Sequence, residues 1–214
     1  ANDGNLIGVA SGQRASIRAD NLLDLSALES IQSLDGKALK TSQAQLVFDA
    51  GAAVKIETSS AVQLLQSQAA GAVTLSAVGD ITVLGEINAV DGLSIQSSQT
   101  VLSQAALKTD AGLLSIESIG GEIALQAAAD ARSTLGTGSV AIRAAGDIQA
   151  ANVFASRDGG LLLSSVAGSV VQSDPTSVWS AGQIGVVSTA ALGSDAAPLQ
   201  VDTDVFAARV GGAL

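Results

Sequence analysis

The stretch Gly71-Ala72-Val73-Thr74-Leu75 decides the fold, because it places Val73 and Leu75 two residues apart behind a glycine. Side chains two residues apart lie on the same face of a β-strand. Each such run is interrupted after about four to six residues by glycine, serine, asparagine or aspartate, which is typical of a strand bounded by turns and too short for a helix. The same phrase returns at Gly92-Leu93-Ser94-Ile95, Gly138-Ser139-Val140-Ala141-Ile142 and Gly182-Gln183-Ile184-Gly185-Val186.

The glycine of this phrase recurs at a nearly constant interval. The intervals are 20, 21, 20, 26, 22 and 22 residues, counted over Gly51, Gly71, Gly92, Gly112, Gly138, Gly160 and Gly182. A repeat of this size indicates a solenoid, in which each unit stacks only on its neighbours. A phrase that is copied along the chain also favours a scaffold over an enzyme.

Two further strands fit into each period. A second phrase follows the first by eight or nine residues, at Gly79-Asp80-Ile81, Gly121-Glu122-Ile123, Gly146-Asp147-Ile148 and Gly168-Ser169-Val170. A third strand precedes the next first phrase, as in Asn152-Val153-Phe154-Ala155 and Ser177-Val178-Trp179-Ser180. Three short strands in about 20–22 residues predict an all-β parallel β-helix of roughly ten coils, because parallel strands stack about 4.8 Å apart around an aliphatic core.

We predict a single β-helix domain over residues 1–214, in which residues 1–50 form the least regular coils. The leucine spacing there resembles a helix, but serines and Asp35-Gly36 interrupt it, and β coils are favoured. Ser103–Asp110 and Ala124–Ser133 are rich in alanine, yet the period requires strands or turns at both. The 26-residue interval predicts a protruding loop at Ala127–Gly136, and a proline predicts a second loop at Ser173–Thr176.

The composition excludes several classes of function. The chain has no cysteine and no histidine, which excludes disulfides, thiolate or imidazole metal sites and nucleophiles of these types. A net charge of −10, with ten scattered basic residues, argues against nucleic acid as a partner. No apolar run approaches the roughly 20 residues that span a bilayer, and the first residues form no signal peptide. We expect no cofactor, and open strand edges predict a fragment of a longer protein.

Two kinds of segment resemble filamentous-haemagglutinin-type bacterial exoproteins and giant surface adhesins. Val78-Gly79-Asp80-Ile81 and Ala145-Gly146-Asp147-Ile148 are similar to their repeats. The tail from Leu192 to Val201, followed by Asp202 to Ala208, is similar to their recurring Gly-Ser…Pro-Leu segment, although Ala197 stands where that segment usually has asparagine. The resemblance implies a right-handed β-helix flanked by repeats of the same chain. It also implies export through an outer-membrane secretion partner, a secreted or cell-surface location, and a function in adhesion, biofilm or cell-to-cell contact.

An acidic ladder is one candidate site. Asp80, Glu122 and Asp147 occupy the same position in their coils, and neighbouring coils would bring them about 4.8 Å apart. Calcium requires about six to eight oxygen ligands from a looped cage, and the glycine-rich nonapeptide that binds calcium in β-rolls is absent. We therefore interpret these residues as solvated turns and expect no metal site.

An aromatic column is the second candidate. Val153-Phe154, Val178-Trp179 and Val205-Phe206 are assigned to equivalent third strands, 25 and 27 residues apart. If the aromatic rings face outward, Phe154, Trp179 and Phe206 form a surface for sugar rings or a protein partner. If they face inward, they form a packed core ladder, which is the favoured interpretation. Asp130 and Arg132 in the first predicted loop complete the candidate partner-binding residues.

Two classes of function stay open. The first is a structural rod segment of a large secreted or cell-surface bacterial adhesin. The alternative is a module that binds a host or bacterial surface glycan or protein through a lateral face or the inserted loops. A polysaccharide-degrading enzyme is less favoured, because glycoside hydrolysis needs two carboxylates across a groove, and this chain offers one Trp, three Phe and no Tyr or His around such a site. We expect no enzymatic activity.

Overall fold

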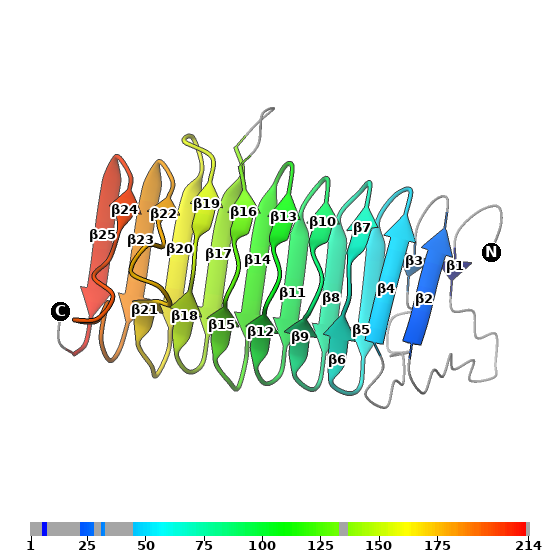
Figure 1. The fold of residues 1–214 in the computed structure, drawn as a ribbon, viewed down its shortest axis with the longest axis horizontal. Coiled ribbons are helices and arrows are strands. Elements are labelled where there is room, and N and C mark those ends of the chain that lie inside the picture. The colour runs from blue at the N-terminus through cyan, green and yellow to red at the C-terminus, as the bar shows by residue number, and fades with distance from the viewer. Residues whose placement is uncertain (1–5, 8–21, 28–30, 33–44, 133–136, 213–214) are drawn as a thin grey trace.

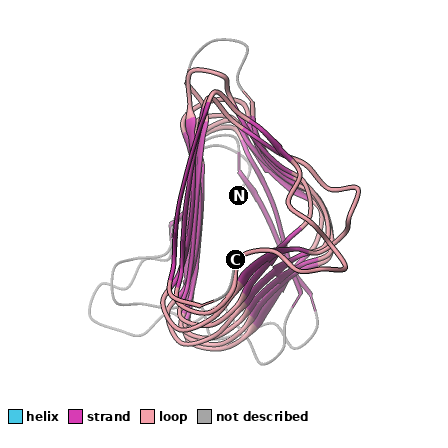
Figure 2. Cartoon of the chain, turned by 90° about the vertical axis from the view of Figure 1, so that its left-hand side faces the viewer, coloured by secondary structure: helices cyan, strands magenta, loops and turns pink. Residues whose placement is uncertain are grey.

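The chain forms a parallel β-solenoid. A computed structural model describes residues 6–7, 22–27, 31–32, 45–132 and 137–212. Over these residues about eight turns stack along one rod (Figure 1), somewhat fewer than the ten expected. The turns enclose a triangular cross-section (Figure 2). The described residues contain no helix, and therefore none that is long and apolar enough to cross a membrane. The prediction of an all-β parallel solenoid is confirmed.

The first wall of the rod is a ten-stranded parallel sheet that contains most of the longer strands. In spatial order it consists of β1 (Leu6–Ile7), β3 (Ile31–Gln32), β5 (Val54–Thr58), β8 (Val73–Ala77), β11 (Leu93–Ser97), β14 (Leu113–Ser118), β17 (Ser139–Ala144), β20 (Gly160–Ser165), β23 (Gln183–Ser188) and β25 (Val205–Val210). We call this wall the first face.

The other two walls belong to one 15-stranded sheet that bends at a corner. The second face consists of β6 (Val62–Leu64), β9 (Ile81–Val83), β12 (Val101–Ser103), β15 (Ile123–Leu125), β18 (Ile148–Ala150) and β21 (Val170–Gln172). The third face consists of β7 (Ser67–Ala69), β10 (Ile87–Ala89), β13 (Leu107–Thr109), β16 (Ala129–Ala131), β19 (Val153–Ala155), β22 (Trp179–Ser180) and β24 (Val201–Asp202). Three strands per coil were predicted and are present in these coils.

The two halves of this sheet meet at β4 (Gln45–Ala50), which also pairs with β2 (Leu22–Ala27). Its first residues pair with β6, through Leu46 and Leu64, and its last residues pair with β7, through Ala50 and Ala69. One straight strand is therefore continued by two short strands in the next coil. The backbone N–H of Phe48, which lies where the ladder divides, donates to the Ser67 hydroxyl over 3.1 Å.

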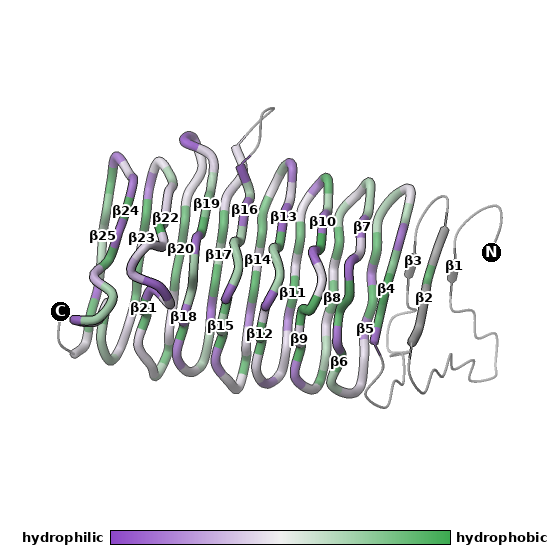
Figure 3. The backbone as a smooth tube through the Cα atoms, viewed as in Figure 1, coloured by the Kyte–Doolittle hydropathy of each residue, from purple (hydrophilic) through white to green (hydrophobic). Residues whose placement is uncertain are grey.

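Columns of aliphatic side chains in strict register fill the interior. In seven strands of the first face alternate side chains are buried: β5, β8, β11, β14, β17, β20 and β23. Figure 3 shows that hydrophobic residues recur along the whole length of the rod. Burying one such side chain contributes about 1.5–3 kcal/mol. The members of one column are at most 2% exposed: Val54, Val73, Leu93, Leu114, Val140, Leu161 and Ile184.

Buried serine hydroxyls at the ends of first-face strands bind the turns of the preceding coil. The Oγ of Ser97 donates to the carbonyl of Gly79 over 2.8 Å, and the Oγ of Ser165 donates to the carbonyl of Gly146 over 2.8 Å. Ser188 makes the same contact with Gly168 over 3.0 Å. A buried carbonyl without a partner is costly, so this serine column joins successive coils.

The register of the first face corrects the alignment of the glycine phrase. Gly182, like Gly71, Gly112 and Gly138, stands two positions before the first inward-facing residue, whereas Gly92 and Gly160 stand one position before it. In the coil of Gly160 the equivalent position is held by Gly159. A Cβ atom at Gly182 would collide with the carbonyl oxygen of Arg157 in the preceding coil, so the backbones approach too closely for a side chain.

Most of the segments that were expected to be irregular contain strands. β2 and β3 lie where the leucine spacing resembled a helix, so strands are confirmed for these residues, and the alanine-rich segments contain β13, β15 and β16 as the period required. The loop predicted at Ala127–Gly136 is wrong for residues 129–131, because β16 pairs with both β13 and β19; residues 133–136 lie outside the described part. The loop at Ser173–Thr176 is confirmed as a turn between β21 and β22.

The last described coil is held by a buried glutamine. The side-chain Nε2 of Gln172 donates to the carbonyl of Gln200 over 2.9 Å, and its Oε1 accepts from the Gln200 N–H over 2.7 Å. The following strand β25 pairs only with β23 among the described strands. Its residue Phe206, in register with the buried Ile184, is 42% exposed.

Candidate functional site

The candidate residues Asp130, Arg132 and Phe154 lie together on the third face. The three-residue strands of this face bury their first and last side chains, so the middle side chain points outward. The register aligns Asn88, Lys108, Asp130 and Phe154 as one outward column across four coils. Successive members of such a column are about 4.8 Å apart.

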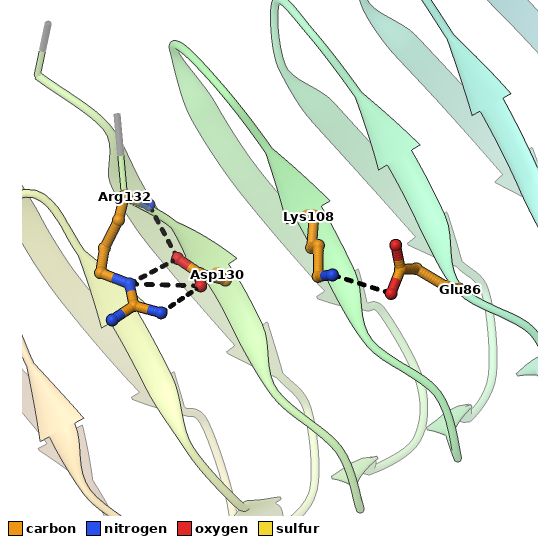
Figure 4. A network of polar contacts seen from close by, with 4 residues as sticks. All are labelled: Glu86, Lys108, Asp130 and Arg132. Carbon is orange, nitrogen blue, oxygen red and sulfur yellow. Dashed lines mark hydrogen bonds and ion pairs between the residues drawn. The ribbon is translucent and has the colours of Figure 1, made fainter. Parts of the chain in front are cut away.

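Arg132 folds back onto Asp130 (Figure 4). Its Nε donates to Asp130 Oδ1 over 3.0 Å, and its terminal nitrogen donates to Asp130 Oδ2 over 2.6 Å. The backbone N–H of Arg132 also donates to Asp130 Oδ1 over 2.9 Å. The guanidinium carbon lies 4.2 Å from the centroid of the Phe154 ring, which is a cation–π contact.

A second ion pair continues this row towards the N-terminus. Lys108 Nζ lies 2.8 Å from Glu86 Oε2, with both side chains 43% exposed. We call Glu86, Lys108, Asp130, Arg132 and Phe154 the charged strip. Its two carboxylates and two cationic groups alternate along the strip, so the strip has no net charge. The whole chain, in contrast, has a net charge of −10.

The electrostatics of Asp130 favour its ionised form. Burial alone would raise the pKa of Asp130, but hydrogen bonds from the Arg132 side chain and backbone, and the positive charges of Arg132 and Lys108, lower it below 3.8 overall. The same pairing raises the pKa of the Arg132 guanidinium. A carboxylate held ionised by a bidentate arginine is poorly suited to act as a general acid.

Trp179 does not belong to this strip. The register aligns Trp179 with the inward-facing Val153, and aligns Phe154 with Ser180, so the predicted equivalence of the two aromatic residues is wrong by one position. Trp179 is fully buried, and its indole Nε1 donates to the carbonyl of Ala151 over 3.0 Å. The shift arises because the loop before β22 is longer than the corresponding corners of earlier coils.

Phe206 is also separate from the other aromatic residues. It lies in β25 on the first face, where it pairs with Ile184, and not on the third face. The predicted column of Phe154, Trp179 and Phe206 is therefore wrong: one ring is covered by Arg132, one is in the core and one is on another wall.

The acidic residues that follow the second-phrase glycines are exposed and serve the backbone. Asp80 Oδ1 accepts the N–H of Thr100 in the next coil over 3.0 Å, and Asp147 Oδ1 accepts the N–H of Ser169 over 2.7 Å. These contacts cap a turn of the neighbouring coil. Within the described ranges, no group of three or more acidic residues converges as metal ligands would.

Sequence reasoning missed Glu86 and Lys108. Both could have been found from the period, because opposite charges that lie 22 residues apart fall on adjacent coils. No known protein family, characterised protein or solved structure was found to match this chain. The chemistry of the charged strip is therefore the guide to its role. The Glu86–Lys108 pair and the Arg132–Phe154 contact join neighbouring coils, the Asp130–Arg132 pair holds Arg132 in place, and these charged groups are paired with one another.

Proposed function

We propose that the chain is a structural rod segment of a large secreted or cell-surface bacterial adhesin. The observation that supports a rod is the unbroken register of the first face. From β5 to β23 each strand continues the same inward-facing columns, and β25 keeps their backbone register, although the coils differ in length. A stack of this kind keeps its two ends at a fixed separation, which is what a spacer between a cell and a binding tip requires.

The charged strip is consistent with this role. Its two ion pairs and the Arg132–Phe154 contact are all satisfied within the chain. The Glu86–Lys108 pair and the Arg132–Phe154 contact join adjacent coils, whereas the Asp130–Arg132 pair lies within one coil. The adhesin context comes from the resemblance of the repeat phrase and the tail to filamentous-haemagglutinin-type exoproteins. Secretion through an outer-membrane partner and display on the bacterial surface belong to the same proposal.

A replacement experiment tests the spacer role. In the protein as the cell produces it, residues 54–188 would be deleted in one strain and exchanged for an unrelated β-solenoid of equal length in another. Attachment of the cells to a glycan-free surface would be measured. A spacer predicts that deletion reduces attachment and that the unrelated solenoid restores it. Continued loss with the replacement would contradict the spacer role and favour specific recognition by this chain.

The location is tested separately. Antibodies against the purified chain, applied to intact cells and to the culture medium of the producing bacterium, should label the surface or the medium. Detection only after the cells are lysed would contradict the proposed location. The adhesin part of the proposal would then fail, although a structural rod role would not be excluded.

A further inference from the structure

One corner of the rod departs from the repeat. The connection between β21 and β22 contains six residues, 173–178, whereas the five earlier corners between the second and third faces that the structure describes contain two or three. Those corners are residues 65–66, 84–86, 104–106, 126–128 and 151–152. In repeat proteins an insertion into one unit maps to a surface loop, often on the binding face.

The inserted loop has a defined conformation. The carboxylate Oδ1 of Asp174 accepts the Thr176 N–H over 2.7 Å and the Thr176 hydroxyl over 2.6 Å. The N–H of Ser177 donates to the Asp174 carbonyl over 3.0 Å. The N–H of Val178 donates to Asn152 Oδ1 in the preceding coil over 2.8 Å. A loop held in this way loses little conformational entropy when a ligand binds beside it.

The loop forms one side of a polar groove. The groove has a volume of about 430 Å³, within the range of small-molecule sites. The small apolar groups of Ala124, Leu125 and Ala151 also contribute to it. Its remaining lining is polar and comes from Gln126, Gln149, Asn152, Ser173, Asp174, Thr176 and Ser177.

The donors and acceptors of this groove are mostly neutral. Gln126 and Gln149 are exposed, and among the described residues their side-chain amides have no hydrogen-bond partner. Each amide can donate two hydrogen bonds and accept two. No lysine or arginine lines the groove, so an anionic ligand would find no positive charge there.

Other ligand classes fit less well. A peptide that binds by strand addition needs a free sheet edge, but β18 is paired with β15 and β21, and β19 is paired with β16 and β22. A calcium ion needs about six to eight oxygen ligands, and Asp174 is the single carboxylate in the lining. A ligand with many neutral hydroxyl groups matches the amides and hydroxyls that are present.

We propose that the groove beside residues 173–178 binds a neutral saccharide. Gln126, at the corner of one coil, and Gln149, on the second face of the next coil, supply amide hydrogen bonds, and Thr176 and Asp174 contribute from the loop. The inference goes beyond the spacer role, because a rod needs no groove. Its failure would leave the rod proposal unchanged.

The test uses neutral oligosaccharides as probes. The full chain would be screened by saturation-transfer NMR and calorimetry against neutral gluco-, galacto- and N-acetylglucosamine oligosaccharides, with uronic-acid and sulfated oligosaccharides alongside. We expect at least one neutral probe to bind, and we expect Gln149→Ala and Gln126→Ala each to weaken it by about tenfold in Kd, the loss of one or two hydrogen bonds.

Gln104→Ala is the matched control. Gln104 stands at the same corner position one coil before Gln126, with its N–H bound to Val83 as that of Gln126 is bound to Ser103, but it lies outside the groove. It should leave binding unchanged, and all three variants should unfold at the wild-type temperature because their side chains are exposed. The proposal is overturned if no neutral probe binds, if acidic probes bind more tightly, or if binding survives Gln149→Ala and Gln126→Ala together.

Discussion

At the scale of single residues, glycine is required where backbones of adjacent coils meet. Gly182→Ala would place a methyl group on the carbonyl oxygen of Arg157, and relief would require the coils to separate. We expect the free energy of unfolding to fall by about 1–3 kcal/mol, as for other overpacked sites. Chemical denaturation measures this. Gly185→Ala in the same strand is the control, because its methyl group would meet Leu162 at an ordinary 3.5 Å. Equal effects of the two substitutions would show that the close approach does not constrain the fold.

Trp179 is the largest side chain in the core. Trp179→Ala should destabilise the chain by about 3–5 kcal/mol through the cavity that it leaves. Trp179→Phe should cost less, about 1–3 kcal/mol, because the main loss is the partner of the Ala151 carbonyl. Urea unfolding measures both. In the wild type, Trp179 emission should be blue-shifted and protected from iodide; emission like that of free tryptophan would place the ring in solvent and contradict the observed register.

The pairing of Asp130 with Arg132 predicts that the free energy of unfolding depends on pH. Its pKa is lower in the folded chain than its ordinary value of 3.8, so the unfolded chain binds the proton more readily. The stabilisation by Asp130 is therefore fully present above about pH 4 and is lost as the pH falls through the folded pKa. The stability difference between the wild type and Asp130→Asn should shrink below pH 4. Asp195→Asn, at an exposed position, is the control for general charge effects; a difference that stayed constant down to pH 2 would contradict the pairing with Arg132.

At the scale of secondary-structure elements, the serine column joins strands to turns. Ser165 Oγ donates to the Gly146 carbonyl and accepts the Gly168 N–H over 2.8 Å, so its removal leaves two backbone groups without this partner. Ser165→Ala should lower the free energy of unfolding by about 1–3 kcal/mol. Ser164→Ala, on the outward side of the same strand, should change it by less than about 0.5 kcal/mol. Thermal unfolding of both variants compares them, and similar losses would refute a special role for the column.

The element scale also explains which sequence predictions succeeded. Val73 and Leu75 predict their strand because alternation depends only on the local chain. The pairing register of Trp179, in contrast, depends on the length of the corner that precedes its strand. That corner contains the six residues 173–178, and Trp179 pairs with Val153, one position away from Phe154. A single-residue shift moves a side chain to the other side of a strand. Phe206 was assigned to the wrong face for the same reason, because the tail before it is irregular.

The charged strip shows the limit of sequence reasoning about the site. Asp130 and Arg132 were proposed as loop residues open to a partner, and they are paired with each other instead. Their proximity follows from a strand spacing of two residues, but the position of Arg132 over Phe154 depends on the coil of Phe154 stacking next to it. Gln126, Gln149 and Thr176 line the groove only because three successive coils bring them together.

At the scale of the whole molecule, the protection of the backbone should vary along the rod. Every central strand has two neighbours, whereas β25 has one among the described strands. In a stack of nearest-neighbour units, opening begins at the least supported unit. Hydrogen exchange measured by mass spectrometry should be slowest from β8 to β20 and fastest in β24 and β25. Uniform protection along the rod would mean that it opens in a single cooperative step.

The burial of Trp179 has a consequence for chemical durability. The whole chain contains no cysteine, methionine, histidine or tyrosine, and Trp179 is its single tryptophan. Thiols and thioethers are the side chains that peroxide and hypochlorite attack first, and the indole ring is fully enclosed. The chain thus has no sulfur atom to oxidise, and its one indole ring is shielded in the folded state. Exposure to peroxide should leave its mass and fold unchanged while proteins rich in sulfur are inactivated.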